Sequence, residues 1–218
     1  MIEVNIAGKN CQIIEKGKPH KVIYLANEDG LQLESHLSDC NDFLLVCYGV
    51  EDWNRDFSPW PYRMNKNFDF KGEGKKTLEW LVNDCQKYVR DNYGEIDDQY
   101  VCGYSLAGLF SLWAFYECDA FNGVGSFSGS LWFEGWHDYI ETKKKHGLMY
   151  LSLGNRESNT RNQVMAKVYD ETVHQYEIAS KSCKCIFELN EGGHFDNVNE
   201  RIARGVKWLI VNDVDNVL

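Results

Sequence analysis

Long apolar stretches are missing from this sequence of 218 residues. Nowhere do about eighteen apolar residues follow one another, the length that a membrane-spanning helix requires. The first residues, MIEVNI, also lack the basic start and apolar centre of a secretion signal. We therefore expect a soluble, cytoplasmic protein with no membrane partner.

Positive charge is scarce as well. The 23 Lys and Arg residues are outnumbered by 33 Asp and Glu residues, which gives a formal net charge of -10. This excess of negative charge repels phosphate backbones and anionic lipid surfaces. We therefore exclude nucleic acid as an expected partner, whereas a small neutral substrate is compatible with the charge.

The sequence contains no Cys-x-x-Cys spacing, although it has 8 cysteines. Most of them lie in apolar runs, and Cys183 and Cys185 would share one face of a strand without a second cluster to complete a zinc site. We therefore expect reduced thiols packed in the core, with neither disulfides nor a bound metal.

Repeats, low-complexity tracts and linkers are also absent, and proline occurs only 3 times. Two of the prolines fall in residues 50–62, an aromatic-rich stretch that we expect to form a long structured loop. With 44% hydrophobic and 14% aromatic residues, the chain has enough apolar material for a full core. The prediction is one domain that spans residues 1–218.

What the chain does contain is a regular alternation of strand and helix patterns. Two short runs, residues 1–8 and 11–16, predict an antiparallel hairpin at the start. The other predicted strands are 20–26, 42–48, 101–104, 123–129, 148–153 and 183–189. The predicted helices are 31–40, 77–93 with Thr77 as its cap, 106–117, a segment ending near 146, 162–180, and a last helix ending near 211. This order predicts an α/β fold in which helices cover both faces of a mostly parallel sheet.

The stretch from Val101 to Phe110 is where we expect the chemistry. An apolar strand ends in GYSLA, residues 103–107, and continues directly into helical sequence. This pattern is typical of a nucleophile elbow, a sharp turn that pushes a Ser side chain clear of the sheet. Small residues two positions before and after the Ser let the turn pack against the helix. We interpret Ser105 as a nucleophile.

A serine hydroxyl is a weak nucleophile at neutral pH because its proton must leave as it attacks. A His within hydrogen-bond reach can take that proton, and a carboxylate can hold the imidazole in place. Of the 6 histidines, His194 fits best, because it follows the last predicted strand in a Gly-Gly-His loop that lets the ring approach Ser105. The other histidines lie at a strand start or in helices, where local or solvent contacts account for them.

The orienting carboxylate is assigned to Glu157, which is separated by three residues, 154–156, from the end of the strand predicted at 148–153, the one before the His-bearing strand. Asp170 and Glu171 lie deeper in helical sequence, and Asp196 could reach the His194 ring only through an unusual local turn. A loop carboxylate paired with a neighbouring Arg is the alternative reading of Glu157. In our assignment, nucleophile, acid and base follow one another at the carboxyl ends of strands, where open parallel sheets place their ligands.

The tetrahedral intermediate of such a reaction needs N–H donors for its negatively charged oxygen. The backbone N–H of Leu106, directly after the nucleophile, would supply the first donor. The second would come from Asn27 or Glu28, directly after the strand at 20–26, and we place it at Asn27.

Large aromatic residues gather near the same end of the predicted sheet. They would either line a pocket for an apolar or aromatic group or simply cover the core. We assign Trp53, Trp60 and Trp132 to substrate binding. Arg55 and Arg63 could meet an acidic group of a substrate, although solvated loop charges are the simpler interpretation.

Three stretches together resemble a known family. They are residues 103–109 (GYSLAGL), 52–61 (DWNRDFSPWP) and 128–132 (SGSLW). From about Lys21 onward the sequence is similar to the putative-esterase group of α/β hydrolases, which includes esterase D and enterochelin-esterase-like proteins. The resemblance implies an α/β-hydrolase fold and a serine carboxylesterase without a cofactor. Ser105 and His194 match the nucleophile and base of the family, and Glu157 falls where many members carry their acid.

The chain has no insertion long enough for a lid domain, which within this family implies an open site. We also expect no large amino-terminal domain of the kind that some siderophore esterases have. Ser, acid and His follow one another in the order that α/β hydrolases use.

These features predict an enzyme that hydrolyses a small or medium ester, its small-molecule partner, through an acyl-enzyme intermediate. An acyltransferase would use the same triad and pass the acyl group to an alcohol or thiol instead of water. A catalytically silent hydrolase fold used for binding is the third hypothesis, and the joint presence of elbow, acid and His argues against it.

Overall fold

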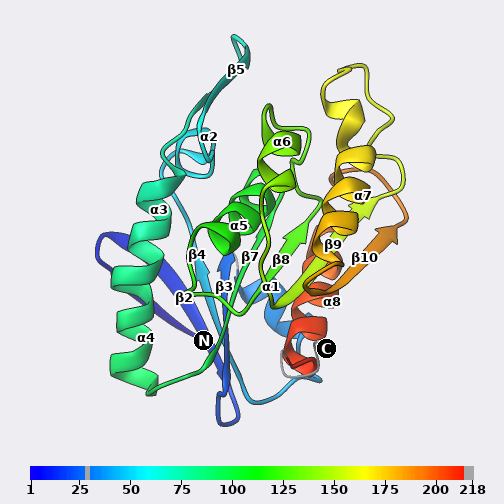
Figure 1. Ribbon diagram of the computed structural model, residues 1–218. Helices are drawn as coiled ribbons and strands as arrows, with labels where there is room; N and C mark the ends of the chain where they lie inside the picture. The colour runs from blue at the N-terminus through cyan, green and yellow to red at the C-terminus, as the bar shows by residue number, and fades with distance from the viewer. Residues whose placement is uncertain (28–29, 214–218) are drawn as a thin grey trace.

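The computed structural model describes residues 1–27 and 30–213. Its centre is an eight-stranded sheet with the strand order β1-β2-β4-β3-β7-β8-β9-β10 (Figure 1). The strands are β1 (Ile2–Ile6), β2 (Lys9–Lys16), β3 (Lys21–Ala26), β4 (Phe43–Tyr48), β7 (Asp98–Tyr104), β8 (Gly123–Phe127), β9 (Leu148–Gly154) and β10 (Lys184–Asn190). Strand β2 runs antiparallel to both β1 and β4, and every other pair is parallel. The predicted parallel sheet with an antiparallel N-terminal hairpin is confirmed.

Helices cover both faces of this sheet (Figure 1). On one face α3 (Gly74–Trp80), the π-helical turn η1 (Leu81–Cys85) and α4 (Gln86–Tyr93) follow one another, beside α5 (Leu106–Glu117), α6 (Trp136–Glu141) and α7 (Val168–Ala179). The other face is covered by α1 (Gly30–His36) and α8 (Val198–Val211). Within the described ranges, no helix is long and apolar enough to cross a membrane.

Strand β3 shows why the central strands contain long apolar runs, such as the one from Val22 to Ala26 in β3. All of its residues are buried, and successive side chains point to opposite faces of the sheet. Val22 and Tyr24 pack in the cluster that contains α5, whereas Ile23 and Leu25 pack in the cluster that contains α8. Since burial of each large aliphatic side chain stabilises the fold by about 1.5–3 kcal/mol, the strand is held from both sides. The ends of the parallel strands are therefore rigid platforms for side chains.

Residues 50–62 differ from the expected loop. They contain α2 (Trp53–Asp56), capped by Asp52, whose side chain accepts a hydrogen bond from the Arg55 N–H at 2.9 Å. They also begin a separate hairpin of β5 (Pro61–Asn65) and β6 (Phe68–Lys71), which projects from one end of the molecule (Figure 1). Strand β5 was not predicted because its first residue is Pro61, and proline usually indicates a loop. Proline is tolerated as the first residue of an edge strand because no ladder N–H is needed there.

The helix starting near Thr77 was predicted three residues too late. It begins at Gly74, and Thr77 lies inside it rather than capping it. The Thr77 hydroxyl is buried and donates to the Asp56 carbonyl at 2.8 Å, which ties α3 to α2. A local capping preference was therefore overridden by a tertiary contact.

Other element ends also differ from the prediction. Helix α1 ends at His36 instead of residue 40, and α6 ends at Glu141 instead of near 146. Strand β8 ends at Phe127, because Ser128 turns the chain with a positive φ of 47°. Helix α7 begins at Val168, preceded by the 3-10 turn η2 (Met165–Lys167). Periodicity alone does not show where such turns interrupt a pattern.

Candidate active site

Ser105 occupies the turn between β7 and α5, with φ 58° and ψ -123°. These angles lie in a region that non-glycine residues rarely adopt, so surrounding contacts must hold the turn. The Ser105 N–H donates to the Phe127 carbonyl at 2.9 Å, and the Ser105 carbonyl accepts from the Ser130 N–H at 3.0 Å. A Cβ at Gly103 would lie 2.3 Å from the Ala107 carbonyl oxygen. The elbow therefore requires glycine at position 103, and the strained Ser105 backbone is bonded on both sides.

The structure brings Ser105, His194 and Glu157 together. Nε2 of His194 lies 3.0 Å from Oγ of Ser105, and Nδ1 of His194 lies 2.7 Å from Oε2 of Glu157. The three residues follow β7, β10 and β9, whose carboxyl ends lie at the same edge of the sheet. With Nδ1–H donating to the carboxylate, Nε2 carries the lone pair that faces the serine hydroxyl.

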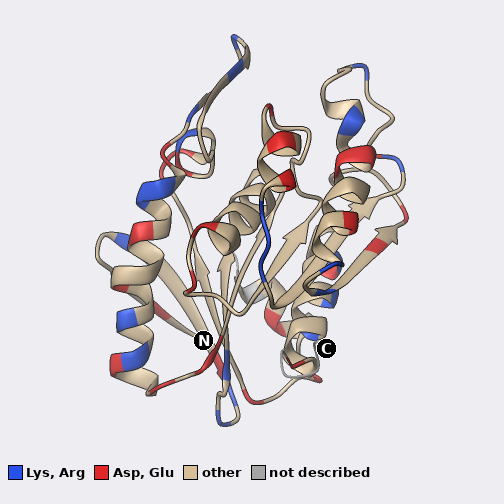
Figure 2. Ribbon diagram, viewed as in Figure 1, with Lys and Arg blue, Asp and Glu red and all other residues tan. Residues whose placement is uncertain are grey.

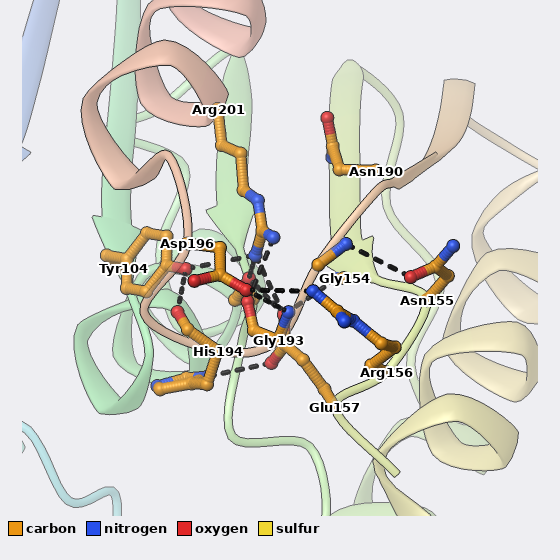
Figure 3. A network of polar contacts seen from close by, with 12 residues as sticks. Tyr104, Gly154, Asn155, Arg156, Glu157, Asn190, Gly193, His194, Asp196 and Arg201 are labelled. Carbon is orange, nitrogen blue, oxygen red and sulfur yellow. Dashed lines mark hydrogen bonds and ion pairs between the residues drawn. The ribbon is translucent and has the colours of Figure 1, made fainter. Parts of the chain in front are cut away.

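The loops that carry Glu157 and His194 are bonded to each other. The Asn155 N–H donates to the Asn190 carbonyl at 2.8 Å, and the Arg156 N–H donates to the Gly192 carbonyl at 3.0 Å. In return the Gly192 N–H donates to the Asn155 side chain at 3.0 Å. These bonds fix the acid relative to the base, and Figure 3 shows the contact between the Glu157 and His194 side chains.

Arg201, on the first turn of α8, is the functional neighbour that sequence reasoning missed. Its side chain is 1% exposed, and Nη1 donates to Oε1 of Glu157 at 3.0 Å and to Oγ of Ser128 at 3.1 Å. Nη2 donates to the carbonyl oxygens of Gly193 at 2.9 Å and Glu191 at 3.2 Å (Figure 3). The guanidinium thus joins the acid to the loop that carries the base. The only signal in the sequence is a cation on the apolar face of a helix.

Two further donors complete the environment of Glu157. The Ser128 hydroxyl donates to Oε1 at 2.7 Å, and the Gly154 N–H donates to the same oxygen at 2.6 Å. Burial, which leaves the Glu157 side chain 3% exposed, favours the neutral acid, but the hydrogen bonds from His194 and Ser128 outweigh it and lower the pKa of Glu157. Glu157 is therefore held as a carboxylate.

The two expected oxyanion donors have different surroundings. Leu106 is the first residue of α5 and lines the cavity beside Ser105, and the first N–H groups of a helix have no acceptor within the helix. The Asn27 N–H donates instead to the Tyr48 carbonyl at 3.1 Å, which extends the pairing of β3 with β4. That N–H is engaged, so the structure contradicts its use as the second donor. Glu28, the other candidate, lies outside the described residues.

A cavity of about 410 Å³ opens over Ser105 and His194. Trp53 and Trp132 line it, as expected, and so do Phe68 and Phe70 from the hairpin that sequence reasoning missed. Trp60 does not line it. Its Nε1 donates to the Glu134 carbonyl at 2.8 Å, and its ring packs against Phe133 and Trp136. Trp60 is therefore a covering residue.

A larger hollow, of about 1210 Å³, lies beside the N-terminal hairpin and is lined by none of the three triad residues.

The cysteines and one His/Glu group carry side chains of the types that bind metal ions. All eight cysteines are free thiols. His137, Glu141 and His174 have potential ligand atoms within 4.8 Å of one another. The two imidazoles are stacked with planes 10° apart, and Nδ1 of His137 lies 2.9 Å from a Glu171 oxygen. Because a metal ion lies in the plane of each imidazole that binds it, two parallel stacked rings cannot share one ion without turning.

Several solved structures share the fold of this chain. An IroE-like serine hydrolase from Shewanella oneidensis has a TM-score of 0.75 and 14% identity, over 93% of this chain and 75% of the other. The siderophore hydrolase EstB from Aspergillus nidulans has a TM-score of 0.72 and 16% identity, over 95% of this chain and 93% of the other. The enterobactin hydrolase IroE, in its complex with DFP, has a TM-score of 0.68 and 12% identity, over 97% of this chain and 94% of the other. The predicted α/β-hydrolase fold is confirmed.

No curated protein matches the sequence. The family profile described as "Putative esterase" matches residues 34–195, which include the elbow, Glu157 and His194. That match spans most of the chain and all three residues that meet at the strand ends. The chain therefore belongs to the Putative esterase family, an esterase group with the α/β-hydrolase fold.

Proposed function

We propose that this protein is a serine carboxylesterase with Ser105 as nucleophile, His194 as base and then acid, and Glu157 as the carboxylate that orients His194. The observation that supports it best is the continuous chain of contacts, 3.0 Å from Ser105 Oγ to His194 Nε2 and 2.7 Å from His194 Nδ1 to Glu157 Oε2. Both distances fall within hydrogen-bond reach, the first requirement for proton transfer.

The reaction begins when Ser105 Oγ attacks the carbonyl carbon of the ester and its proton passes to Nε2 of His194. Glu157 stabilises the imidazolium, and the Leu106 N–H faces the developing oxyanion. When the tetrahedral intermediate collapses, the bond to the alcohol oxygen breaks and His194 returns its proton to that oxygen. Water then attacks the acyl-enzyme by the same route, which releases the acid and restores Ser105.

The buried Arg201 gives this triad a particular electrostatic balance. Its charge offsets that of Glu157, so the resting triad carries a compensated ion pair rather than a lone buried carboxylate. Compensation of this kind supports an ionised Glu157 at neutral pH, which orients the His194 ring for its exchange with Ser105.

Labelling with a fluorophosphonate probe tests the nucleophile directly. We expect stoichiometric labelling of the wild-type protein at Ser105, and no labelling of Ser105→Ala. Ester turnover should fall by about 10⁴-fold or more in the same variant. An unlabelled wild type, or equal labelling of both proteins, would overturn the assignment. Product analysis with an added alcohol would show whether water or the alcohol receives the acyl group.

A further inference from the structure

The cavity over Ser105 is walled mostly by apolar side chains. Trp53 comes from α2, Phe68 and Phe70 from β6, and Trp132 from the segment after β8. Phe70 packs against both Phe68 and Trp132, with ring centroids 6.2 Å apart in each pair. Met165 and Val168 add apolar lining from η2 and α7, and the uncharged polar residues Asn54 and Thr160 also line the cavity. An apolar group that enters the cavity would therefore be desolvated on several sides.

Charge is almost missing from this lining. Among the described residues that line the cavity, Glu157 and His194 are the ionisable ones, and Arg201 offsets the Glu157 carboxylate. Neither Arg55 nor Arg63 lines it. Nε of Arg55 lies 2.7 Å from an Asp56 carboxylate oxygen, so that guanidinium is already paired. Figure 2 shows basic residues at the outer tip of the β5–β6 hairpin instead. An anionic group in the cavity would meet no cation to replace its hydration.

The direction of the alcohol follows from the role of His194. Because His194 donates its proton to the leaving oxygen, the alcohol must lie on the His194 side of the carbonyl carbon. Phe195 stands there, with its ring 4.9 Å from the His194 ring between centroids and 86% of the residue exposed. The oxyanion occupies a second direction, toward Leu106. The remaining direction from the carbonyl carbon points toward the aromatic walls of the cavity, and we place the acyl chain there.

We propose that the cavity selects esters with an uncharged, apolar acyl group, which packs against Phe68, Phe70 and Trp132 while the alcohol leaves across Phe195. This inference rests on the proposed function and adds its substrate class. It distinguishes this protein from an esterase whose pocket binds a negatively charged acyl group through a cation.

The test compares three 4-nitrophenyl esters with the same six-carbon acyl chain. They are 4-nitrophenyl hexanoate, the mono-4-nitrophenyl ester of adipic acid (the adipate monoester), and 4-nitrophenyl methyl adipate (the methyl diester). The adipate monoester ends in a carboxylate, and the methyl diester controls for its length. We expect kcat/KM for the adipate monoester to be about 100-fold or more below that for the hexanoate, with the methyl diester close to the hexanoate. Assays in 0.5 M NaCl screen the long-range effect of the protein's negative charge.

Equal rates for the hexanoate and the adipate monoester, or faster turnover of the monoester, would overturn the inference. Fluorophosphonate labelling of Ser105 keeps this failure separate from a failure of the proposed function. If Ser105 is labelled but the charged chain is accepted, the esterase assignment stands and the substrate class falls. If Ser105 is not labelled, the proposed function itself fails.

Two variants locate the acyl and alcohol sides. Trp132→Ala should lower kcat/KM for the hexanoate about 10-fold more than for the acetate, because only the longer chain reaches the aromatic wall. Phe195→Ala should change the ratio of naphthyl to ethyl hexanoate turnover and leave the hexanoate-to-acetate ratio unchanged. Labelling stoichiometry shows that each variant is folded. If Phe195→Ala alters the acyl ratio and Trp132→Ala does not, the orientation is reversed and the proposal is wrong.

Discussion

Two His–Glu pairs in this molecule have nearly the same hydrogen-bond geometry and very different surroundings. In the first pair, Nδ1 of His194 lies 2.7 Å from Glu157, and in the second, Nδ1 of His137 lies 2.9 Å from Glu171. The first lies where three parallel strands end, and the second lies between α6 and α7. Distance alone does not distinguish a catalytic pair from a surface pair.

The difference lies in burial and in the third partner. The Glu157 and His194 side chains are 3% and 29% exposed, whereas those of Glu171 and His137 are 19% and 53% exposed. Glu157 is also bonded to Arg201, and the His137 ring stacks on His174. His194 also lies within hydrogen-bond distance of the Ser105 hydroxyl, whereas Nδ1 of His137 faces the Glu171 carboxylate and its ring faces His174. The comparison shows that the first pair differs from the second by an adjacent Ser105 hydroxyl and a buried countercharge, and these are the two features on which the proposed function depends.

Substituting the two acids should give the largest contrast. Glu157→Gln removes the charge that stabilises the His194 imidazolium, so we expect kcat to fall by about 10³–10⁴-fold. Glu171→Gln is the matched control and should leave kcat within about 2-fold, because solvent screens its pair. Steady-state ester hydrolysis measures both. Similar activity losses in the two variants would remove the distinction drawn between the pairs.

The buried countercharge should have the next largest effect. Arg201→Gln leaves Glu157 without its guanidinium partner, so we expect a loss of about 3–5 kcal/mol in the free energy of unfolding. Arg204→Gln is the control on the same helix, since Arg204 is half-exposed and bonds Glu188 at 2.7 Å, and it should cost less than about 1 kcal/mol. Urea denaturation measures both values. Equal losses would mean that Arg201 acts only as an ordinary surface cation.

The surface pair should show the smallest effect, limited to acidic pH. The hydrogen bond that His137 donates to the Glu171 carboxylate raises the pKa of His137 above its ordinary value of 6.5. A pKa raised in the folded state stabilises the fold below about pH 6.5, and this contribution is lost as the pH rises through the raised pKa. Because His137 is largely exposed, we expect Glu171→Gln to lower Tm by only about 1 °C at pH 5.5 and not at pH 9. A Tm difference of the same size at both pH values would contradict the ionic origin.

Much of the architecture could be predicted from the sequence, because local residue patterns determine where strands and helices form. Strand β3 and helix α5 lie within one residue of the expected bounds, since uninterrupted apolar runs are typical of elements buried on all sides. Helix ends were predicted less well. Thr77 looked like a cap in sequence, but its hydroxyl bonds the Asp56 carbonyl, a partner 21 positions away. Contacts of that separation are invisible to a periodicity argument.

The elbow at Ser105, the later acid and the last His follow from the sequence by itself, because strand ends, glycines and chain order are local properties. Only the tertiary structure decided what surrounds them. It brought Arg201 from α8 onto Glu157, placed Phe68 and Phe70 in the cavity, and kept Trp60 out of it. It also engaged the Asn27 N–H with Tyr48. The physical reason is that a side chain's face can be inferred from its period, whereas its partners depend on packing between segments far apart in the chain.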